Sequence, residues 1–210
     1  PSAGDEQIAG FLADGLPVVS IGRPPADSSL PHVDLHSAAT TQLLLDHLRA
    51  QGARRIGLII GSQRRTPYLE AIAAYQADAG ERGMTPVVKK VDETRGEAGG
   101  REAALDMLTR HPQLDAICAP VDALAVGAVQ ALHQLGRRIP DDVMIATRYD
   151  GLRARTCDPP LTALNLHLDT VATQAVDLLL ERLRGDTSRT AIDGPPAELI
   201  VRGSTQRPAR

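Results

Sequence analysis

Aromatic residues are scarce in this chain of 210 residues, which has three Tyr, one Phe and no Trp. Proteins that bind single-stranded nucleic acids stack the bases on aromatic side chains, so this composition argues against such a site. The net charge of −3 also argues against a chain whose whole surface binds nucleic acid. Because aromatic residues are so few, the core has to be built from aliphatic side chains.

Cysteines and long apolar runs are scarce as well. The two cysteines, Cys118 and Cys157, stand apart and predict neither a disulfide framework nor a zinc site. No apolar run is long enough to cross a membrane, and Pro1 to Glu6 do not have the pattern of a signal peptide. We therefore expect a cytoplasmic protein without membrane contact, in which Cys118 is a small buried residue at the end of a strand.

The short motifs that mark common enzymes are also missing. There is no Gly-x-Ser-x-Gly, no phosphate-binding Gly-x-x-x-x-Gly-Lys and no His-Glu-x-x-His. The glycine-rich stretch 97–100 opens a helix without the rest of a dinucleotide-binding motif. We expect no catalytic residue, no metal and no cofactor. An enzyme on the same scaffold stays an alternative, because a fold does not fix a function.

Strand-like apolar segments alternate with helical patterns along almost the whole chain. The strand-like segments are 17–22, 32–35, 56–60, 87–91, 114–118, 143–146, 161–166 and 199–201. Helical spacing runs from Ser37 to Gly52, from Thr66 to Gly80, from Glu97 toward Pro112, from Asp122 to Gly136 and from Leu168 to Arg184. This alternation predicts an α/β fold with doubly wound parallel sheets, which bind ligands at the carboxyl ends of their strands.

Two of these helices carry more detailed predictions. Asp122 is expected to cap the helix that it opens, because a carboxylate can accept from the free backbone N–H groups there. In the last helix, the apolar spacing predicts an inward stripe at Val171, Ala175, Leu178, Leu179 and Leu183.

Six stretches resemble, in order, the motifs of one family of bacterial regulators. They read GLPVV at 15–19, DHLRAQGARRI at 46–56, LDAI at 114–117 followed by DALAVGA at 122–128, LGRRIPDDV at 135–143, PPLT at 159–162 and LIVRGST at 199–205. With these stretches at such intervals, the chain resembles the ligand-binding part of the LacI/GalR family of transcription regulators. The PPLT and LIVRGST stretches favour these repressors over the related periplasmic sugar-binding proteins.

The resemblance implies two doubly wound parallel-sheet lobes of the periplasmic-binding-protein-like type, with an effector in the cleft between them. The N-terminal lobe would comprise 1–36 and 166–193, and the C-terminal lobe 37–165 and 194–210. The N-terminal lobe is expected to be incomplete, which would leave the strand 18–21 with an exposed edge. The helix-turn-helix that the family uses to bind operator DNA as a dimer is not expected within these residues.

The function implied is that of the effector-binding and dimerisation domain of a LacI-type regulator, with a repressor favoured and a homodimer expected. A small-molecule effector would shift the lobes between two arrangements and so change operator binding through the missing DNA-binding domain. The alternative is the solute-binding protein of a sugar transporter.

The family recognises sugars through polar side chains at recurring positions, and this chain changes nearly all of them. Two arginines, Arg65 and Arg148, are new polar groups of this chain. Together with the positions that the resemblance implies, the expected effector-binding residues are His36, Arg65, Ala71, Val121, Asp122, Arg148 and Tyr149. Lost hydrogen-bond partners weaken sugar binding, and arginine suits carboxylate and phosphate groups. Among sugar or sugar-like effectors, an anionic one is therefore favoured. The alternative is that Arg148 pairs with Asp122 or Asp150 and only shapes the cleft.

Two histidines follow strand-like segments that would be neighbours between the lobes. His36 follows 33–35 and His167 follows 165–166. A facing pair of histidines could sense pH or bind a metal. Because no further ligand stands at a metal-binding spacing, two ordinary hydrogen-bonded histidines are expected instead.

Overall fold

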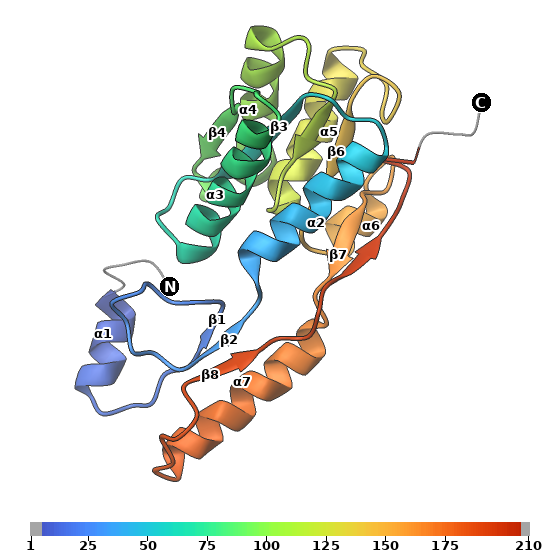
Figure 1. Ribbon diagram of the computed structural model, residues 1–210. Coiled ribbons are helices and arrows are strands. Elements are labelled where there is room, and N and C mark those ends of the chain that lie inside the picture. Colours follow the sequence, from blue (N-terminus) through green and yellow to red (C-terminus); the bar gives the residue numbers. More distant parts are fainter. Residues whose placement is uncertain (1–5, 207–210) are drawn as a thin grey trace.

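The computed structural model describes residues 6–206 and has two α/β lobes of unequal size, shown in Figure 1. The larger lobe is built on a four-stranded parallel sheet with the strand order β4-β3-β5-β6. Its strands are β3 (Ile56–Gly61), β4 (Val88–Val91), β5 (Ala116–Cys118) and β6 (Met144–Ala146). All residues of β3, β5 and β6 are buried, as expected of parallel strands that are covered on both faces.

Four helices provide that cover. One core contains apolar residues of α2 (Ser37–Ala50) and α3 (Thr66–Glu81). The other contains apolar residues of α4 (Gly96–Arg110) and α5 (Asp122–Gln134). Alternate strand residues join opposite cores, since successive side chains of a strand point to opposite faces. Both cores are mainly aliphatic, as the composition predicts.

The smaller lobe has a three-stranded parallel sheet in the order β1-β2-β8. Its elements are α1 (Glu6–Ala13), β1 (Ser20–Ile21), β2 (His32–Asp34), α7 (Leu168–Leu183) and β8 (Ala191–Asp193). In residues 6–206, β1 pairs only with β2, and Ile21 of β1 is 52% exposed to solvent. The exposed edge predicted for this strand is therefore confirmed.

Three segments cross between the lobes in Figure 1. They lead from β2 into α2, from β7 (Ala163–Asn165) into α7, and from β8 into β9 (Glu198–Ile200). β7 and β9 pair antiparallel, while Thr162 makes a parallel bridge to Ala146 beside β6. The crossings bring parts of the chain together that lie far apart in the sequence.

The predicted α/β fold with parallel sheets is confirmed, but four short elements are not predicted. They are α1, the 3-10 helix η1 (Glu93–Arg95), α6 (Leu152–Thr156) and β8. The predicted cap at Asp122 is wrong, because Val121 holds the cap position and Asp122 is the first helical residue. The Asp122 carboxylate instead accepts a hydrogen bond from the neighbouring N–H of Ala123.

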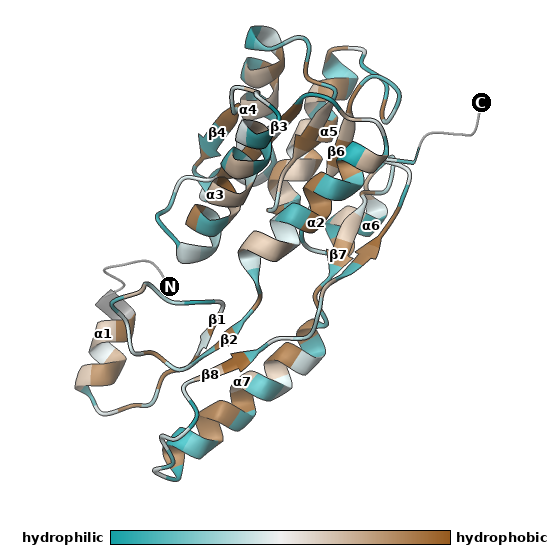
Figure 2. Ribbon diagram, viewed as in Figure 1, coloured by the Kyte–Doolittle hydropathy of each residue, from teal (hydrophilic) through white to brown (hydrophobic). Residues whose placement is uncertain are grey.

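The inward stripe of α7 is only partly right. Val171 and Leu178 are buried, whereas Leu183 is 62% exposed. The helix packs on β1 and β2, which have only two and three residues. Figure 2 shows both hydrophobic and hydrophilic residues along α7. The sequence period therefore identifies an amphipathic helix without fixing how far its cover extends.

A buried polar network holds the closing segment of the chain to the larger lobe. Ser204 Oγ accepts from the N–H of Thr162 at 2.8 Å and donates to the Ile145 carbonyl at 2.6 Å. Thr205 Oγ1 lies 2.7 Å from both Thr162 Oγ1 and His47 Nε2. Burial lowers the pKa of His47, so its neutral form is favoured in this network. Three of the family-like stretches thus meet in one structural cluster.

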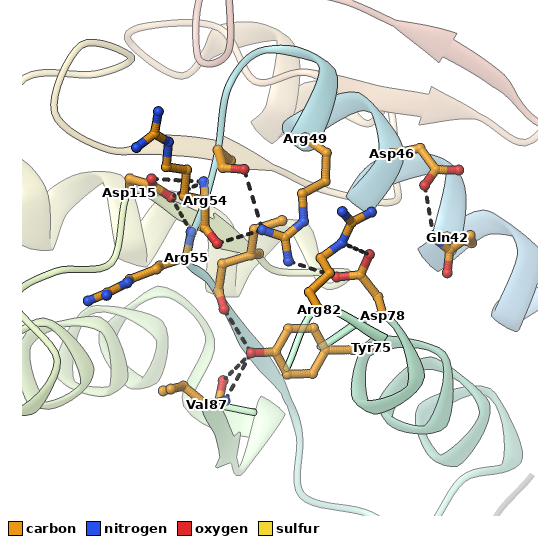
Figure 3. A network of polar contacts seen from close by, with 12 residues as sticks. Gln42, Asp46, Arg49, Arg54, Arg55, Tyr75, Asp78, Arg82, Val87 and Asp115 are labelled. Carbon is orange, nitrogen blue, oxygen red and sulfur yellow. Dashed lines mark hydrogen bonds and ion pairs between the residues drawn. The ribbon is translucent and has the colours of Figure 1, made fainter. Parts of the chain in front are cut away.

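A second network, drawn in Figure 3, joins α2 to α3. Asp78 of α3 is buried and accepts from Arg49 of α2 at 2.8 Å and from Arg82 at 3.1 Å. Tyr75 donates to the Ile56 carbonyl at 2.7 Å and accepts from the N–H of Val87 at 2.9 Å. Burial alone would raise the pKa of Asp78, but the two arginines hold it below its usual value.

We predict that Asp78→Asn lowers the free energy of unfolding by about 3 kcal/mol at pH 7, since it leaves the largely buried Arg49 without its counter-ion. The lowered pKa gives the sign of the pH effect. The stabilisation by Asp78 is complete above the unfolded pKa of about 3.9 and is lost as the pH falls below it. Urea unfolding between pH 7 and pH 3 should show the gap between wild type and variant closing.

The control is Asp46→Asn, which removes an exposed carboxylate that accepts only from Gln42 in this network. It should change the stability by less than about 0.5 kcal/mol. An Asp78→Asn protein as stable as the wild type at pH 7 would contradict the role given to this ion pair.

Glycines set the distance between α4 and α5. A Cβ added at Gly127 would lie 2.2 Å from the Glu97 carbonyl oxygen, and one at Gly100 would lie 2.4 Å from the Leu124 carbonyl oxygen. Both clashes are with backbone atoms, which cannot rotate away. Gly100 of the glycine-rich stretch 97–100 therefore serves close helix packing.

We predict that Gly127→Ala destabilises the protein by about 3 kcal/mol, because the two helices must move apart and loosen the core. Gly80→Ala is the matched control, since Gly80 also lies in a helix but has no atom within 4 Å of an added Cβ. It should stabilise by about 0.5–1 kcal/mol. Chemical denaturation of both variants checks the prediction, and equal effects at the two positions would refute it.

Candidate functional site

A cavity of about 140 Å³ lies between the lobes. It is lined by Ile21, Thr41, Arg65, Pro67, Tyr68, Ala71, Pro120, Arg148 and Tyr149. Ile21 belongs to β1 of the smaller lobe, and the other residues come from the larger lobe. A ligand in this cavity would therefore contact both lobes.

The sheet explains why these residues meet. The segments after β3, β5 and β6 carry the first turn of α3, Pro120 and the pair Arg148-Tyr149. The three strands are parallel neighbours, so their carboxyl ends lie at one edge of the sheet. The predicted position of the ligand site, at the carboxyl ends of the strands, matches the place of this cavity.

Arg148 is the one buried arginine or lysine among the described residues, with 5% of its surface exposed. Its Nη2 donates to the Leu35 carbonyl at 3.0 Å, and its buried Nε has no partner within residues 6–206. The side chain also lies over the Tyr149 ring, with 5.6 Å between Cζ and the ring centre. Burial lowers the pKa of Arg148, because the charged guanidinium is largely removed from water.

Neither of the predicted partners of Arg148 pairs with it. Asp150 binds Arg202 at 2.7 Å and Arg155 at 3.0 Å, and Asp122 accepts from Ala123. The alternative that Arg148 forms an ion pair with Asp122 or Asp150 is therefore wrong.

The acidic residues near the cavity already have partners. Arg65 pairs with Glu93 at 3.1 Å, and Tyr68 donates its hydroxyl to the same carboxylate. Burial and this hydrogen bond raise the pKa of Tyr68, so the phenol stays protonated. Arg65 also extends over the Tyr68 ring, with 5.9 Å between Cζ and the ring centre. This group forms a fixed wall of the cavity.

Arg23, which does not line the cavity, lies between two carboxylates. It forms ion pairs with Asp34 and, at 3.5 Å, with Glu70. Burial alone would raise the pKa of Asp34, but the hydrogen bonds from Arg23 and from the N–H of His36 lower it. For Glu70 burial prevails and the pKa is raised. Arg148 feels both carboxylates at longer range without pairing with either.

The structure brings four of the seven predicted site residues together at this cavity: Arg65, Ala71, Arg148 and Tyr149. Val121 packs against the apolar core instead, and Asp122 lies in the first turn of α5 without lining the cavity. His36 lines a separate cavity of about 320 Å³ beside Pro195 and Pro196. The roles of all seven in effector binding stay predictions.

Sequence reasoning missed Ile21, Thr41, Pro67, Tyr68 and Pro120 as lining residues. The available signal was position, since Tyr68 stands in the first turn of a helix that follows a buried strand. Scarcity was a second signal, because Tyr68 is one of only three tyrosines. Ile21 and Thr41 reach the cavity through the approach of the two lobes, which local sequence does not encode.

The two histidines between the lobes share one backbone arrangement. His36 (φ 49°, ψ 56°) and His167 (φ 49°, ψ 50°) both precede a helix in the left-handed region. Each N–H donates to the side chain two residues earlier, to Asp34 at 2.9 Å and to Asn165 at 3.0 Å. Within residues 6–206, these are the two non-glycine residues with positive φ.

Each histidine faces a carboxylate on the third crossing segment. His36 Nε2 lies 3.8 Å from Asp193, and His167 Nε2 lies 3.6 Å from Glu198. Asp34, His36 and Asp193 are close enough to bind a metal ion together, but His167 is not part of this group. Asp34 already pairs with Arg23, and the contacts of both imidazoles with carboxylates are longer than a hydrogen bond, so the two ordinary hydrogen-bonded histidines stay a prediction. Cys118 is fully buried in β5, and burial raises the pKa of its thiol to about 12, as expected of an inert residue.

Comparisons with known proteins agree with this architecture. A sequence family described as a periplasmic binding protein-like domain matches residues 45–205. The transcriptional regulator CelR of Thermobifida fusca is 28% identical over 198 residues, which cover 90% of this chain and 57% of that protein. The ribose operon repressor of Halalkalibacterium halodurans is 30% identical over 195 residues, covering 91% and 57% of the two chains.

Solved structures give the same picture. A CelR–cellobiose complex superposes with a TM-score of 0.88 at 26% identity, covering 97% of this chain and 63% of that chain. A LacI family regulator from Bifidobacterium animalis gives 0.85 at 25% identity, covering 99% and 76%. This chain thus spans a little over half the length of the curated relatives. Within residues 6–206, no helix is long and apolar enough to span a bilayer.

We predict that His36→Gly gives a more stable protein than His36→Ala, by about 1 kcal/mol. Both variants lose the imidazole, but only glycine adopts positive φ without strain. Chemical denaturation measures the difference. At the exposed helical residue Gln76 the order should reverse, with alanine more stable than glycine by about 1 kcal/mol. The same order at both positions would contradict the strained backbone.

Proposed function

The chain belongs to the family of periplasmic binding protein-like domains found in LacI-type regulators, and on that premise we propose that it binds a small-molecule effector in the cavity between its lobes. The observation that carries the proposal is the composition of the cavity. Its walls come from the ends of β3, β5 and β6 and from β1 of the other lobe. A ligand there can favour one arrangement of the lobes over another, which is the basis of an allosteric switch.

The effector is a sugar or sugar-like molecule. The CelR relative has been solved with cellobiose, and only the class of ligand is carried over to this chain. Tyr68 and Tyr149 line the cavity and provide flat rings for packing, and Arg65 provides hydrogen-bond donors. Thr41 Oγ1 donates to the Ser37 carbonyl at 2.8 Å and can accept a hydrogen bond from a ligand. A common neutral monosaccharide is disfavoured by Ala71, which offers no hydrogen bond at a position where the family has a polar residue.

Regulation of transcription would follow from coupling between this site and DNA. The relatives are transcription regulators and not enzymes. The part of each that matches this chain is 57% of its length, so each has further segments outside the match. In the proposed mechanism, effector binding shifts the lobes formed by 1–36 with 166–193 and by 37–165 with 194–210. A dimer transmits the shift to operator-binding domains outside this chain, most simply as a repressor. This role implies a cytoplasmic location.

Transport is the alternative, in which the same cavity would deliver a solute to a membrane transporter. The comparisons give no support to it, since the relatives described above are regulators. The two functions differ in a measurable way. A regulator's ligand changes the affinity for operator DNA, and the change is reciprocal, because DNA must alter the affinity for the ligand by the same factor.

The first experiment is a thermal shift with a panel of sugars, sugar phosphates, sugar acids and nucleosides. A ligand at 100 times its dissociation constant should stabilise the chain by about 2.7 kcal/mol. Operator binding by the full regulator, with and without that ligand, then tests the coupling. Stabilisation without any effect on DNA would favour transport, and turnover of the ligand would revive the enzyme hypothesis.

We predict that Tyr149→Ala weakens binding of the ligand so found at least tenfold, about 1.4 kcal/mol, because it removes a wall of the cavity. Isothermal titration calorimetry measures the loss. Leu152→Ala, three residues away on α6 and 76% exposed, should leave the affinity unchanged. Equal affinity in wild type and Tyr149→Ala would move the site elsewhere.

A further inference from the structure

The buried charged side chains differ in whether they have an ion-pair partner. Two buried carboxylates, Asp34 and Asp78, each pair with an arginine. Arg148 is the one buried cation in the described part of the chain, and no carboxylate there pairs with it. A buried charge without a direct ion pair is costly, so a ligand that supplies a negative group would stabilise it.

The donors of Arg148 are only partly used. Its single hydrogen bond within residues 6–206 goes to the Leu35 carbonyl, and the buried Nε has no acceptor. The Tyr149 ring lies beside the guanidinium, and the side chain lines the cavity. A guanidinium fixed by these contacts presents its remaining N–H groups in a planar fork, which matches the oxygens of a carboxylate or phosphate.

The nearby acids pair directly with other groups, although Asp34 and Glu70 attract Arg148 at longer range. Glu93 is taken by Arg65 and Tyr68, and Arg23 holds Asp34 and Glu70. Arg65 differs from Arg148, because it is paired and nearly half exposed. Of the two arginines that line the cavity, Arg148 is therefore the one without an ion pair. It lies just after β6, where the larger lobe meets the crossing segment.

We infer that Arg148 binds an anionic group of the effector, a carboxylate or a phosphate, so that the ligand class is a sugar acid or sugar phosphate. This inference rests on the proposed function, because it uses the same cavity. The cavity of about 140 Å³ is smaller than the roughly 300 Å³ at which sites for drug-sized ligands begin. It thus suits a compact ligand that places its charged end against the guanidinium.

The test compares glucose, glucuronate and glucose 6-phosphate in thermal shift at equal ionic strength, with sodium chloride as the reference. Glucuronate and glucose 6-phosphate differ from glucose mainly in charge, and they separate the carboxylate from the phosphate. The expected result is that at least one charged sugar stabilises the wild type and that glucose at the same concentration does not. Inorganic phosphate alone shows whether the anion suffices.

The variants are Arg148→Met, which keeps the length of the side chain without its charge, and Arg64→Met, which removes an exposed charge nearby that does not line the cavity. Arg148→Met should lower the affinity for the stabilising anion at least tenfold, and Arg64→Met should leave it unchanged. Arg148→Lys keeps the charge without the planar fork and should give an intermediate affinity.

Stability without ligand provides a second readout. If Arg148 is kept for a ligand, Arg148→Met should melt at a temperature equal to or higher than that of the wild type, because an unpaired buried charge is gone. A melting temperature several degrees lower would show that Arg148 acts by holding Leu35, and the inference would be overturned.

The inference and the proposed function fail in different ways. Stabilisation by glucose alone, or equal anion binding by wild type and Arg148→Met, overturns the anionic ligand and leaves the effector site intact. If no member of the wider panel stabilises the wild type, the proposed function and the inference fail together.

Discussion

The backbone has to cross between two lobes three times, and this constraint determines the geometry of the cleft. At both strand-to-helix crossings the same solution occurs, a histidine in the left-handed region whose N–H donates to an Asp or Asn side chain two residues earlier. Left-handed backbone is unfavourable for a histidine and is maintained only where the surroundings determine it. The start of α2, and with it Thr41 in the cavity, is oriented by the first crossing.

The crossing also acts directly on the site. Leu35 lies between β2 and the left-handed His36, and its carbonyl accepts from Arg148 at the end of β6. The position of the guanidinium thus depends on how the crossing segment leaves the smaller lobe. A change in the angle between the lobes would move this acceptor relative to the sheet of the larger lobe. This hydrogen bond therefore ties one wall of the cavity to the arrangement of the lobes.

Periodicity in the sequence predicts the larger lobe well and the smaller lobe less well. β3 is a continuous apolar run between two long helical patterns. Such a run is typical of a parallel strand that is buried on both faces, so this strand is predictable from the sequence. β8 has only three residues, two of them exposed, and gains its place through pairing with β2, some 160 positions earlier in the chain. Leu183 has the helical spacing of a core residue, yet nothing in that spacing says how far the neighbouring strands reach.

The site shows the same division between local pattern and long-range contact. Arg65, Ala71, Arg148 and Tyr149 follow strands of one sheet, so their meeting could be predicted, whereas His36 belongs to a crossing and faces another cavity. The sequence could not decide whether Arg148 has a partner, because the competing arginine, Arg202, lies in the closing segment that Ser204 and Thr205 fix beside β6. Arg202 pairs with Asp150, and Arg148 forms no ion pair within the described residues. A structural network near the end of the chain thus engages the carboxylate that the sequence offers as a partner of Arg148.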